Sequence, residues 1–198
     1  MKQAKILLTL ALLPAAMCRP GTAQQYHPTA ARDLQLSAWG AASGVFTGLS
    51  GGKNFSVVVG GDLGFRPWHG VRPTAEVRGT YPIDHGLVDS QKSILGGLRA
   101  DFLLGRRIHP YGDFLFGRGQ MNFQYGYTFG NSVYLVTTTY IDSFGGGFDY
   151  DLSDSLSIKV DGQAQRWGSA PTASGDVYST LGTAGLVYRF GFGRRQRP

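Results

Sequence analysis

Apolar and polar residues alternate with a period of two along most of this chain. In Ser155–Gln165 the even-numbered positions are apolar or glycine and the odd-numbered positions are polar. Residues 55–66, 71–81 and 94–104 repeat the alternation. Successive side chains of a strand point to opposite faces, so this pattern predicts half-buried β-strands. No segment shows the 3.6-residue period of an amphipathic helix.

Eight segments of this kind are separated by clusters of Gly, Pro, Asp and Ser, which favour turns. The predicted strands cover about residues 34–44, 55–66, 71–82, 93–105, 110–120, 138–151, 155–167 and 178–190. Short connections are expected at 67–70, 106–109 and 152–154, and long ones at 45–54, 83–92, 121–137 and 168–177.

This alternation of short and long connections is typical of barrels whose short turns face the periplasm. The expected fold is therefore all-β: an eight-stranded antiparallel up-and-down transmembrane β-barrel over residues 34–192. Both ends of the barrel segment are then expected on the periplasmic side.

The first residues are typical of a signal for export. Lys2 and Lys5 precede an apolar run over residues 6–17, which is shorter than the roughly 20 residues of a membrane-spanning helix. Small residues near Ala23 predict a signal peptide at 1–23, followed by a leader segment at 24–33. Cys18 raises the alternative of a lipoprotein. If Cys18 leaves with the signal, the mature chain can form neither a disulfide nor a thiolate metal site.

Charged residues are few and unusual in kind. They make up 16% of the chain, against about a quarter in soluble proteins. After the predicted signal the lysines are Lys53, Lys92 and Lys159, and the one glutamate is Glu76. The net charge of +6 includes three positive residues of the signal, and no basic stripe with interleaved aromatic residues predicts nucleic-acid binding. The basic residues of 193–198 form a predicted C-terminal tail.

A soluble barrel such as a lipocalin would also alternate, but its outer face would be rich in Lys and Glu. Here the polar face carries Arg, Asp, Gln, Ser and Thr, which suit a narrow interior in which charges pair. We expect a plugged polar lumen with a charge network, not an open channel. Its predicted members are Asp62, Arg72, Glu76, Arg78, Arg99, Asp101, Asp113, Asp149, Lys159, Asp161 and Arg189.

Aromatic residues near strand ends are candidates for the interfacial girdles of a membrane barrel. These candidates are Trp39, Trp68, Tyr81, Tyr111, Tyr140, Tyr150, Trp167 and Tyr188.

Two segments resemble the bacterial outer-membrane β-barrel family of small OmpA/OmpX-like proteins. Phe144–Ser153 reads FGGGFDYDLS and leads into Leu156–Val160, and Leu181–Gly191 is similar to the last strand that the barrel-assembly machinery recognises by a terminal aromatic residue. The resemblance implies location in the cell outer membrane, with membrane lipid and the assembly machinery as partners. Because the chain continues beyond the last strand, Phe190 and Phe192 both remain candidates for the assembly signal.

Residues that could carry catalysis are sparse. His85 lies in a predicted outward loop with Asp84, Asp89 and Ser90, a set that suggests a lipid A-modifying enzyme. The acidic run 149–154 lacks the glycine and the closing glutamate of an EF-hand calcium loop. We therefore predict a non-enzymatic protein without catalytic residues, metal or cofactor.

Loop 121–137 is the expected contact with an extracellular partner, because it is rich in aromatic residues and carries no charge. The alternative is that these residues extend strands five and six above the membrane. The leading functional hypothesis is a structural or surface-interaction role in adhesion or partner binding. A small transport pore, a lipid A-modifying barrel enzyme and a soluble periplasmic barrel are the alternatives.

Overall fold

The computed structural model describes residues 34–49, 51–84, 88–103 and 107–191. The predicted signal peptide 1–23, the leader 24–33, the tail 193–198 and the candidate assembly residue Phe192 lie outside the described residues, as does His85. Within the described residues, no helix is long and apolar enough to cross a membrane.

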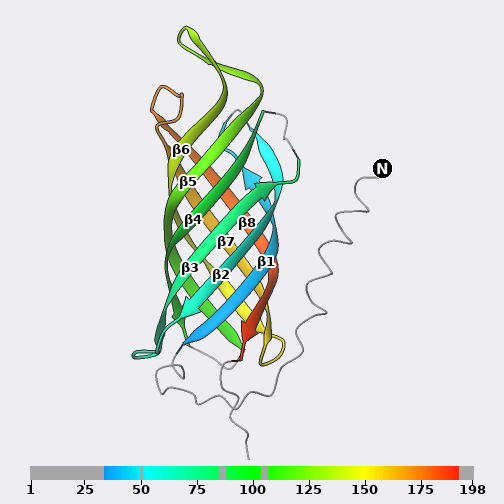
Figure 1. Cartoon of the computed structure of the whole chain (residues 1–198), viewed down its shortest axis with the longest axis vertical. Helices are drawn as coiled ribbons and strands as arrows, with labels where there is room; N and C mark the ends of the chain where they lie inside the picture. Colours follow the sequence, from blue (N-terminus) through cyan, green and yellow to red (C-terminus); the bar gives the residue numbers. More distant parts are fainter. Residues whose placement is uncertain (1–33, 50, 85–87, 104–106, 192–198) are drawn as a thin grey trace, which may run out of the picture.

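Eight antiparallel strands form one closed barrel (Figure 1). Each strand pairs with the next along the chain, and β8 pairs with β1 to close the sheet. The prediction of an eight-stranded antiparallel up-and-down barrel is confirmed. The strands are β1 Gln35–Phe46, β2 Lys53–Gly64, β3 Val71–Pro82, β4 Asp89–Phe102, β5 Ile108–Phe129, β6 Ser132–Asp151, β7 Leu156–Gly168 and β8 Asp176–Phe190.

The largest departure from the predicted strand ends is in β5 and β6. Residues 121–137, expected as a long loop, are strand except for a turn of two residues, Gly130 and Asn131. The alternative of extended strands is therefore correct. Thr, Val, Tyr and Phe dominate the segment and favour strand, and Gly130 has a φ of +62°, a conformation that glycine adopts without strain.

The two ends of the barrel differ. The short-turn end of the barrel carries the connections after β2, β4 and β6. The start of β1 and the end of β8 lie at the same end. The β5–β6 hairpin stands above the opposite end, which we call the hairpin end (Figure 1). The predicted alternation of short and long connections is not found between these strands. The connections after β1, β2 and β3 each span six residues (47–52, 65–70 and 83–88), and the two-residue turn between β5 and β6 is the shortest, because residues predicted as long loops belong to the strands.

The outer wall of the barrel is apolar. Val59, Leu98 and Phe116 are all more than half exposed although they lie at mid-strand. The ten residue steps from Phe55 in β2 to Phe65 just beyond it rise by about 25 Å in a tilted strand, which matches the apolar band of membrane barrels. Along the eight strands, the outward-facing charges all lie towards the hairpin end: Lys53, Lys92, Arg118, Asp142, Arg166 and Asp176.

Three of the eight candidate girdle residues are wrong. Trp39, Tyr111 and Trp167 are buried inside the barrel, whereas Trp68, Tyr81, Tyr140 and Tyr188 are exposed and Tyr150 is half-buried. The physical reason is strand parity, because each of the three shares a face with polar neighbours two residues away. Trp39, for instance, alternates in step with the buried Ser37 and not with the exposed Leu36.

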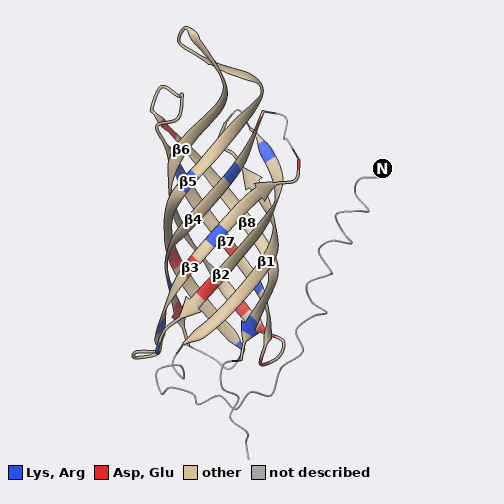
Figure 2. Ribbon diagram, in the orientation of Figure 1, with Lys and Arg blue, Asp and Glu red and all other residues tan. Residues whose placement is uncertain are grey.

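The interior is divided into two zones. Charged side chains fill the half near the short-turn end. In Figure 2, positions of basic and of acidic residues both lie on the strands of that half. The half near the hairpin end holds an apolar cluster together with buried polar side chains, such as Ser56, Thr80 and Gln91. The buried members of the apolar cluster, which we call the apolar plug, are Leu49, Leu95, Leu115, Met121, Phe123, Ile141, Trp167, Ala170 and Val177.

Candidate functional site: the charged lumen and the projecting hairpin

Nine of the eleven side chains predicted for the lumen network are buried inside the barrel. Arg72 and Arg189 are half-buried and line a cavity at the short-turn end. Alternation places each of the eleven on the inward face of its strand, and the closure of the sheet brings seven strands' residues together. The buried members are Asp62, Glu76, Arg78, Arg99, Asp101, Asp113, Asp149, Lys159 and Asp161.

Arg99 on β4 is the first centre of the network. Its Nε donates to Asp101 Oδ1 and its Nη2 to Asp149 Oδ2, both at 2.5 Å. Its Nη1 lies 3.5 Å from Asp62 Oδ2, and its guanidinium stacks on the Tyr111 ring at 3.6 Å from the ring centre. One planar guanidinium thus links three carboxylates from three strands.

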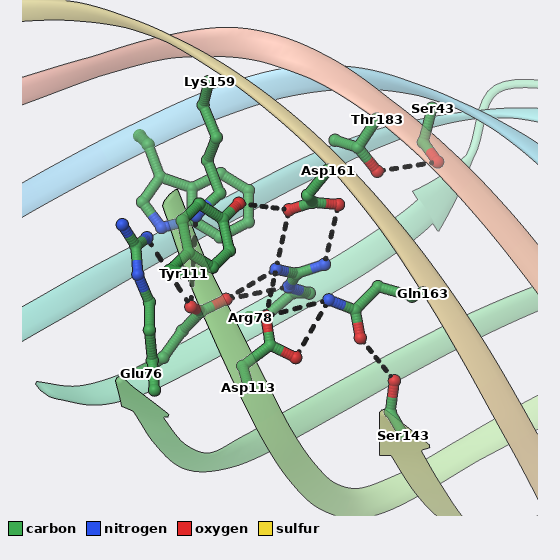
Figure 3. A network of polar contacts seen from close by, with 12 residues as sticks. Ser43, Glu76, Arg78, Tyr111, Asp113, Ser143, Lys159, Asp161, Gln163 and Thr183 are labelled. Carbon is green, nitrogen blue, oxygen red and sulfur yellow. Dashed lines mark hydrogen bonds and ion pairs between the residues drawn. The ribbon is translucent and has the colours of Figure 1, made fainter. Parts of the chain in front are cut away.

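Arg78 on β3 is the second centre (Figure 3). Its Nη2 donates to Glu76 Oε1 at 2.7 Å and to Asp161 Oδ2 at 2.9 Å. Tyr111 also donates its hydroxyl to Asp161 Oδ2, at 3.1 Å. Gln163 extends the network, because its Nε2 lies 3.0 Å from both carboxylate oxygens of Asp113.

Lys159 on β7 is fully buried between aromatic rings. Its Nζ lies 4.4 Å from the ring centre of Tyr111 and 4.6 Å from that of Trp39. The nearest carboxylate oxygen, Glu76 Oε2, is 3.9 Å away. Cation–π attraction and Coulomb attraction together offset the cost of removing this ammonium from water.

Carboxylates outnumber cations in the buried part of the network. Three cations, Arg78, Arg99 and Lys159, face six carboxylates. Each carboxylate has at least one hydrogen bond, from an arginine, Tyr111, Trp39, Thr74 or Gln163. Such a network holds the strands in register and fills the lumen, and breaking it exposes unpaired charges to a dry interior.

A polar cavity of about 300 Å³ lies at the short-turn end. Arg189 Nη1 donates to Asp151 Oδ1 at 2.5 Å, and Arg72 donates to the side chain of Gln35. Asp151 also contacts His109 Nε2 at 2.9 Å. Sequence reasoning missed Gln35, His109 and Asp151, because they lie at strand ends and their pairing depends on register across the closed barrel.

The apolar plug closes the lumen between the charged network and the hairpin end. Trp167 is 1% exposed and donates from Nε1 to Ser179 Oγ at 2.8 Å. Its ring lies over Gly119, where any Cβ would overlap both Trp167 and Ile141. Leu95 and Leu115 are also fully buried in this zone. The plug therefore fills the space that a water-filled channel would need.

The described polar residues do not form a nucleophilic catalytic arrangement. Ser157 donates its hydroxyl to Asp151 at 2.8 Å, and Asp151 contacts His109, so the carboxylate and not the histidine lies next to the serine. Asp89, a candidate of the outward loop, is buried in β4 and accepts a hydrogen bond from Thr47 at 2.6 Å. The described part of the chain holds no group of three metal-ligating side chains.

The upper parts of β5 and β6 form a ribbon that projects beyond the rest of the barrel (Figure 1). The last pair between β5 and β4 is Phe123 with Asp89, and the first between β6 and β7 is Tyr140 with Gly168. Residues 125–135, which we call the ribbon, have strand pairs only with each other, between 127–129 and 132–134. The ribbon carries no charge, and Tyr125, Val133 and Leu135 are strongly exposed, Tyr125 at 88%.

Comparison with known proteins gives matches in structure only. No protein-family model and no curated protein sequence matches the chain. Among solved structures, Neisserial surface protein A (NspA) aligns with a TM-score of 0.56 and 16% identity, covering 79% of this chain and 97% of NspA. This chain has the fold of a small outer-membrane β-barrel.

Looser matches are found with other proteins of this fold. Ail of Yersinia pestis aligns at 12% identity over 80% of this chain and 98% of Ail, with a TM-score of 0.44. The outer membrane enzyme PagL aligns at 17% identity over 78% of this chain and 99% of PagL, also with a TM-score of 0.44.

Proposed function

We propose that this chain is a closed, non-enzymatic barrel of the outer membrane that presents the β5–β6 ribbon to a partner outside the cell. The ribbon carries the proposal, because it projects an uncharged, aromatic surface that no other part of the described chain covers. Exposed apolar side chains on a rigid support are typical of interaction sites. The apolar outer wall supports the membrane setting, and the short turns then face the periplasm.

The filled lumen favours this role over that of a transport pore. Ions that enter the charged half from the short-turn end would meet the apolar plug, in which they lose their hydration. An eight-stranded barrel is only wide enough for side chains to fill, and here they do so from both zones. The lipid-modifying alternative has no observation in its favour among the described residues.

Cysteine labelling tests the location and orientation. Cys18 lies in the predicted signal peptide, so Ser132→Cys in the ribbon and Asp154→Cys in the β6–β7 turn each provide a single reporter. In intact cells, a membrane-impermeant maleimide should label Ser132→Cys and leave Asp154→Cys unlabelled until the membrane is permeabilised. The reverse pattern, or recovery of the protein in the soluble fraction, would contradict the proposal.

Partner binding is tested with a matched pair of surface variants. Tyr125→Ser with Leu135→Ser removes apolar surface from the ribbon, whereas Leu152→Ser removes it from a turn at the opposite end. Cells producing the ribbon variant should adhere less to epithelial monolayers and to plates coated with matrix proteins than cells producing the wild type or Leu152→Ser. Equal adhesion of all three would remove the ribbon from the proposed role.

A further inference from the structure

A groove of about 630 Å³ crosses the outer wall of the barrel towards the hairpin end. Val57, Val59 and Ile94 give it apolar sides, and Gly79 leaves its floor without a side chain. A Cβ on Gly79 would touch its neighbours only at ordinary van der Waals distance, so the groove is open at this point. The depression lies on the face that the lipid covers in the proposed function.

Two cations stand at the rim of this groove. Lys92 on β4 and Arg118 on β5 both line it, and both point outward. Their strands are hydrogen-bonded neighbours: Lys92 pairs with Gln120 and Arg118 with Ile94, which puts the two cations at diagonal positions of one face. Within the described residues, neither side chain has an acidic partner or a hydrogen bond.

The other outward cations of this end are already satisfied by the protein itself. Arg166 Nη2 lies 2.7 Å from Asp142 Oδ2, and Lys53 Nζ lies 5.4 Å from the ring centre of Phe46. Lys92 and Arg118 therefore differ from Arg166, which has a counter-charge on the chain, and from Lys53, which lies over an aromatic ring. Two unpaired cations close together on a membrane-facing wall require an anion from outside.

The level of the two cations indicates where that anion lies. Tyr81 on β3 lines the same groove as Lys92, Tyr140 on β6 pairs with Arg118, and both rings are exposed. Amphipathic rings of this kind settle at the boundary between hydrocarbon and headgroups. Below the cations, Ile94 and Phe116 continue the apolar wall. The site thus combines an anion position at headgroup level with an apolar channel leading into the hydrocarbon.

We propose that Lys92 and Arg118 bind the phosphate of a phosphorylated glycolipid of the outer leaflet, with an acyl chain of that lipid in the groove below. The inference rests on the membrane setting of the proposed function. A free phosphate would use the cations but leave the apolar groove empty, whereas a neutral lipid would fill the groove and leave the cations unpaired. A phosphorylated lipid satisfies both.

The test uses the mature chain inserted into phosphatidylcholine vesicles that contain a minor fraction of a diphosphorylated acyl glycolipid or of its dephosphorylated form. Flotation with the vesicles and heat-modifiable gel migration are measured first. Native mass spectrometry then counts the glycolipid retained per barrel. Lys92→Gln with Arg118→Gln removes the two cations, Gly79→Leu fills the groove, and Arg166→Gln removes a cation that is paired on the protein.

The wild type and Arg166→Gln should retain the phosphorylated lipid, and the Lys92→Gln/Arg118→Gln variant should retain about tenfold less. Gly79→Leu should also lower retention. Equal retention by the double variant, or equal retention of the dephosphorylated lipid by the wild type, overturns the inference while the folded, inserted barrel stands. A chain that does not float with the vesicles overturns the proposed function as well.

Discussion

Arg78 Nη2 lies 2.7 Å from Glu76 Oε1, and both side chains reach the barrel interior from alternate positions of β3. Arg78 Nε donates to the same oxygen at 2.9 Å. A contact between residues two apart on one strand does not by itself join strands. The guanidinium of Arg78 also forms an ion pair with Asp161 on β7, so it links β3 to β7 across the lumen.

Replacing Arg78 with Met should therefore lower the free energy of unfolding by about 3–5 kcal/mol, because Asp161 loses its buried cation and Glu76 loses the cation that donates hydrogen bonds to it. Urea unfolding in lipid vesicles measures the loss. Arg166→Met is the control, since it removes a solvent-exposed pair with Asp142 and should cost less than about 1 kcal/mol. Similar losses in the two variants would show that the buried network does not stabilise the fold.

Gly119 should tolerate no side chain. A Cβ there would overlap the rings and methyl groups of Trp167 and Ile141, so Gly119→Ala should destabilise the barrel by about 1–3 kcal/mol. Gly182 on β8 has open space around the corresponding position, and Gly182→Ala should be nearly neutral. The same unfolding measurement compares the two. An equal effect at both glycines would mean that Trp167 can move aside.

Truncating Trp167 to Ala should cost about 3–5 kcal/mol, because it leaves a large cavity in the apolar plug and removes the hydrogen bond to Ser179. The temperature at which the folded gel band disappears provides the measurement. Tyr178→Ala serves as the control, since this ring is exposed on the outer wall of β8. A larger loss of thermal stability for Tyr178→Ala than for Trp167→Ala would mean that contacts on the outer wall stabilise the barrel more than the apolar plug does.

The wild type should give no stable ion-conducting openings in planar lipid bilayers, since ions that cross the lumen would lose hydration beside the buried apolar plug. Leu95→Ser with Leu115→Ser adds two hydroxyls to the plug and should raise the frequency of brief openings. Large and long-lived openings of the wild-type protein would contradict the closed lumen and favour the transport pore.

Shortening the ribbon should leave the barrel intact. Replacing residues 128–133 with a two-residue turn removes strand that pairs only within the ribbon and keeps Tyr127 and Tyr134, whose rings pack against the apolar plug. The free energy of unfolding should therefore change by less than about 1 kcal/mol. Unfolding in vesicles with wild type as the reference checks this. A large loss would mean that the ribbon helps to hold the strands below it.

Alternation makes most of the fold predictable from sequence. Along β7, every residue from Leu156 to Gln165 follows a strict period of two, so the polar residues alone identify its inward face. The signal weakens where neighbours on opposite faces are both apolar. Ile94 and Leu95 look alike in the sequence, yet Ile94 faces outward and Leu95 is in the plug. Only the register of the closed sheet distinguishes them.

The same limit applies to the site. The inward position of a polar residue such as Asp161 can be predicted when its neighbours in the sequence are apolar. All eleven predicted lumen residues have an apolar neighbour on at least one side. The residue on another strand with which it forms an ion pair or hydrogen bond cannot be predicted in this way. The contact of Asp161 with Arg78 spans 83 residues, and that of His109 with Asp151 spans 42, so both arise from strand order and stagger and not from local pattern.

Because the interior is divided into two zones, the cavity at the short-turn end does not continue through the barrel. Water and small solutes that enter the mouth beside Arg72 and Asp151 can reach the edge of the network at Arg99, because all three line the same cavity. The cavity ends at the charged network, and Leu95 and Trp167 of the apolar plug lie beyond it. The two ends of the barrel therefore present different surfaces to their surroundings. The short-turn end presents a cavity lined by charged side chains, and the hairpin end presents no such cavity among the described residues.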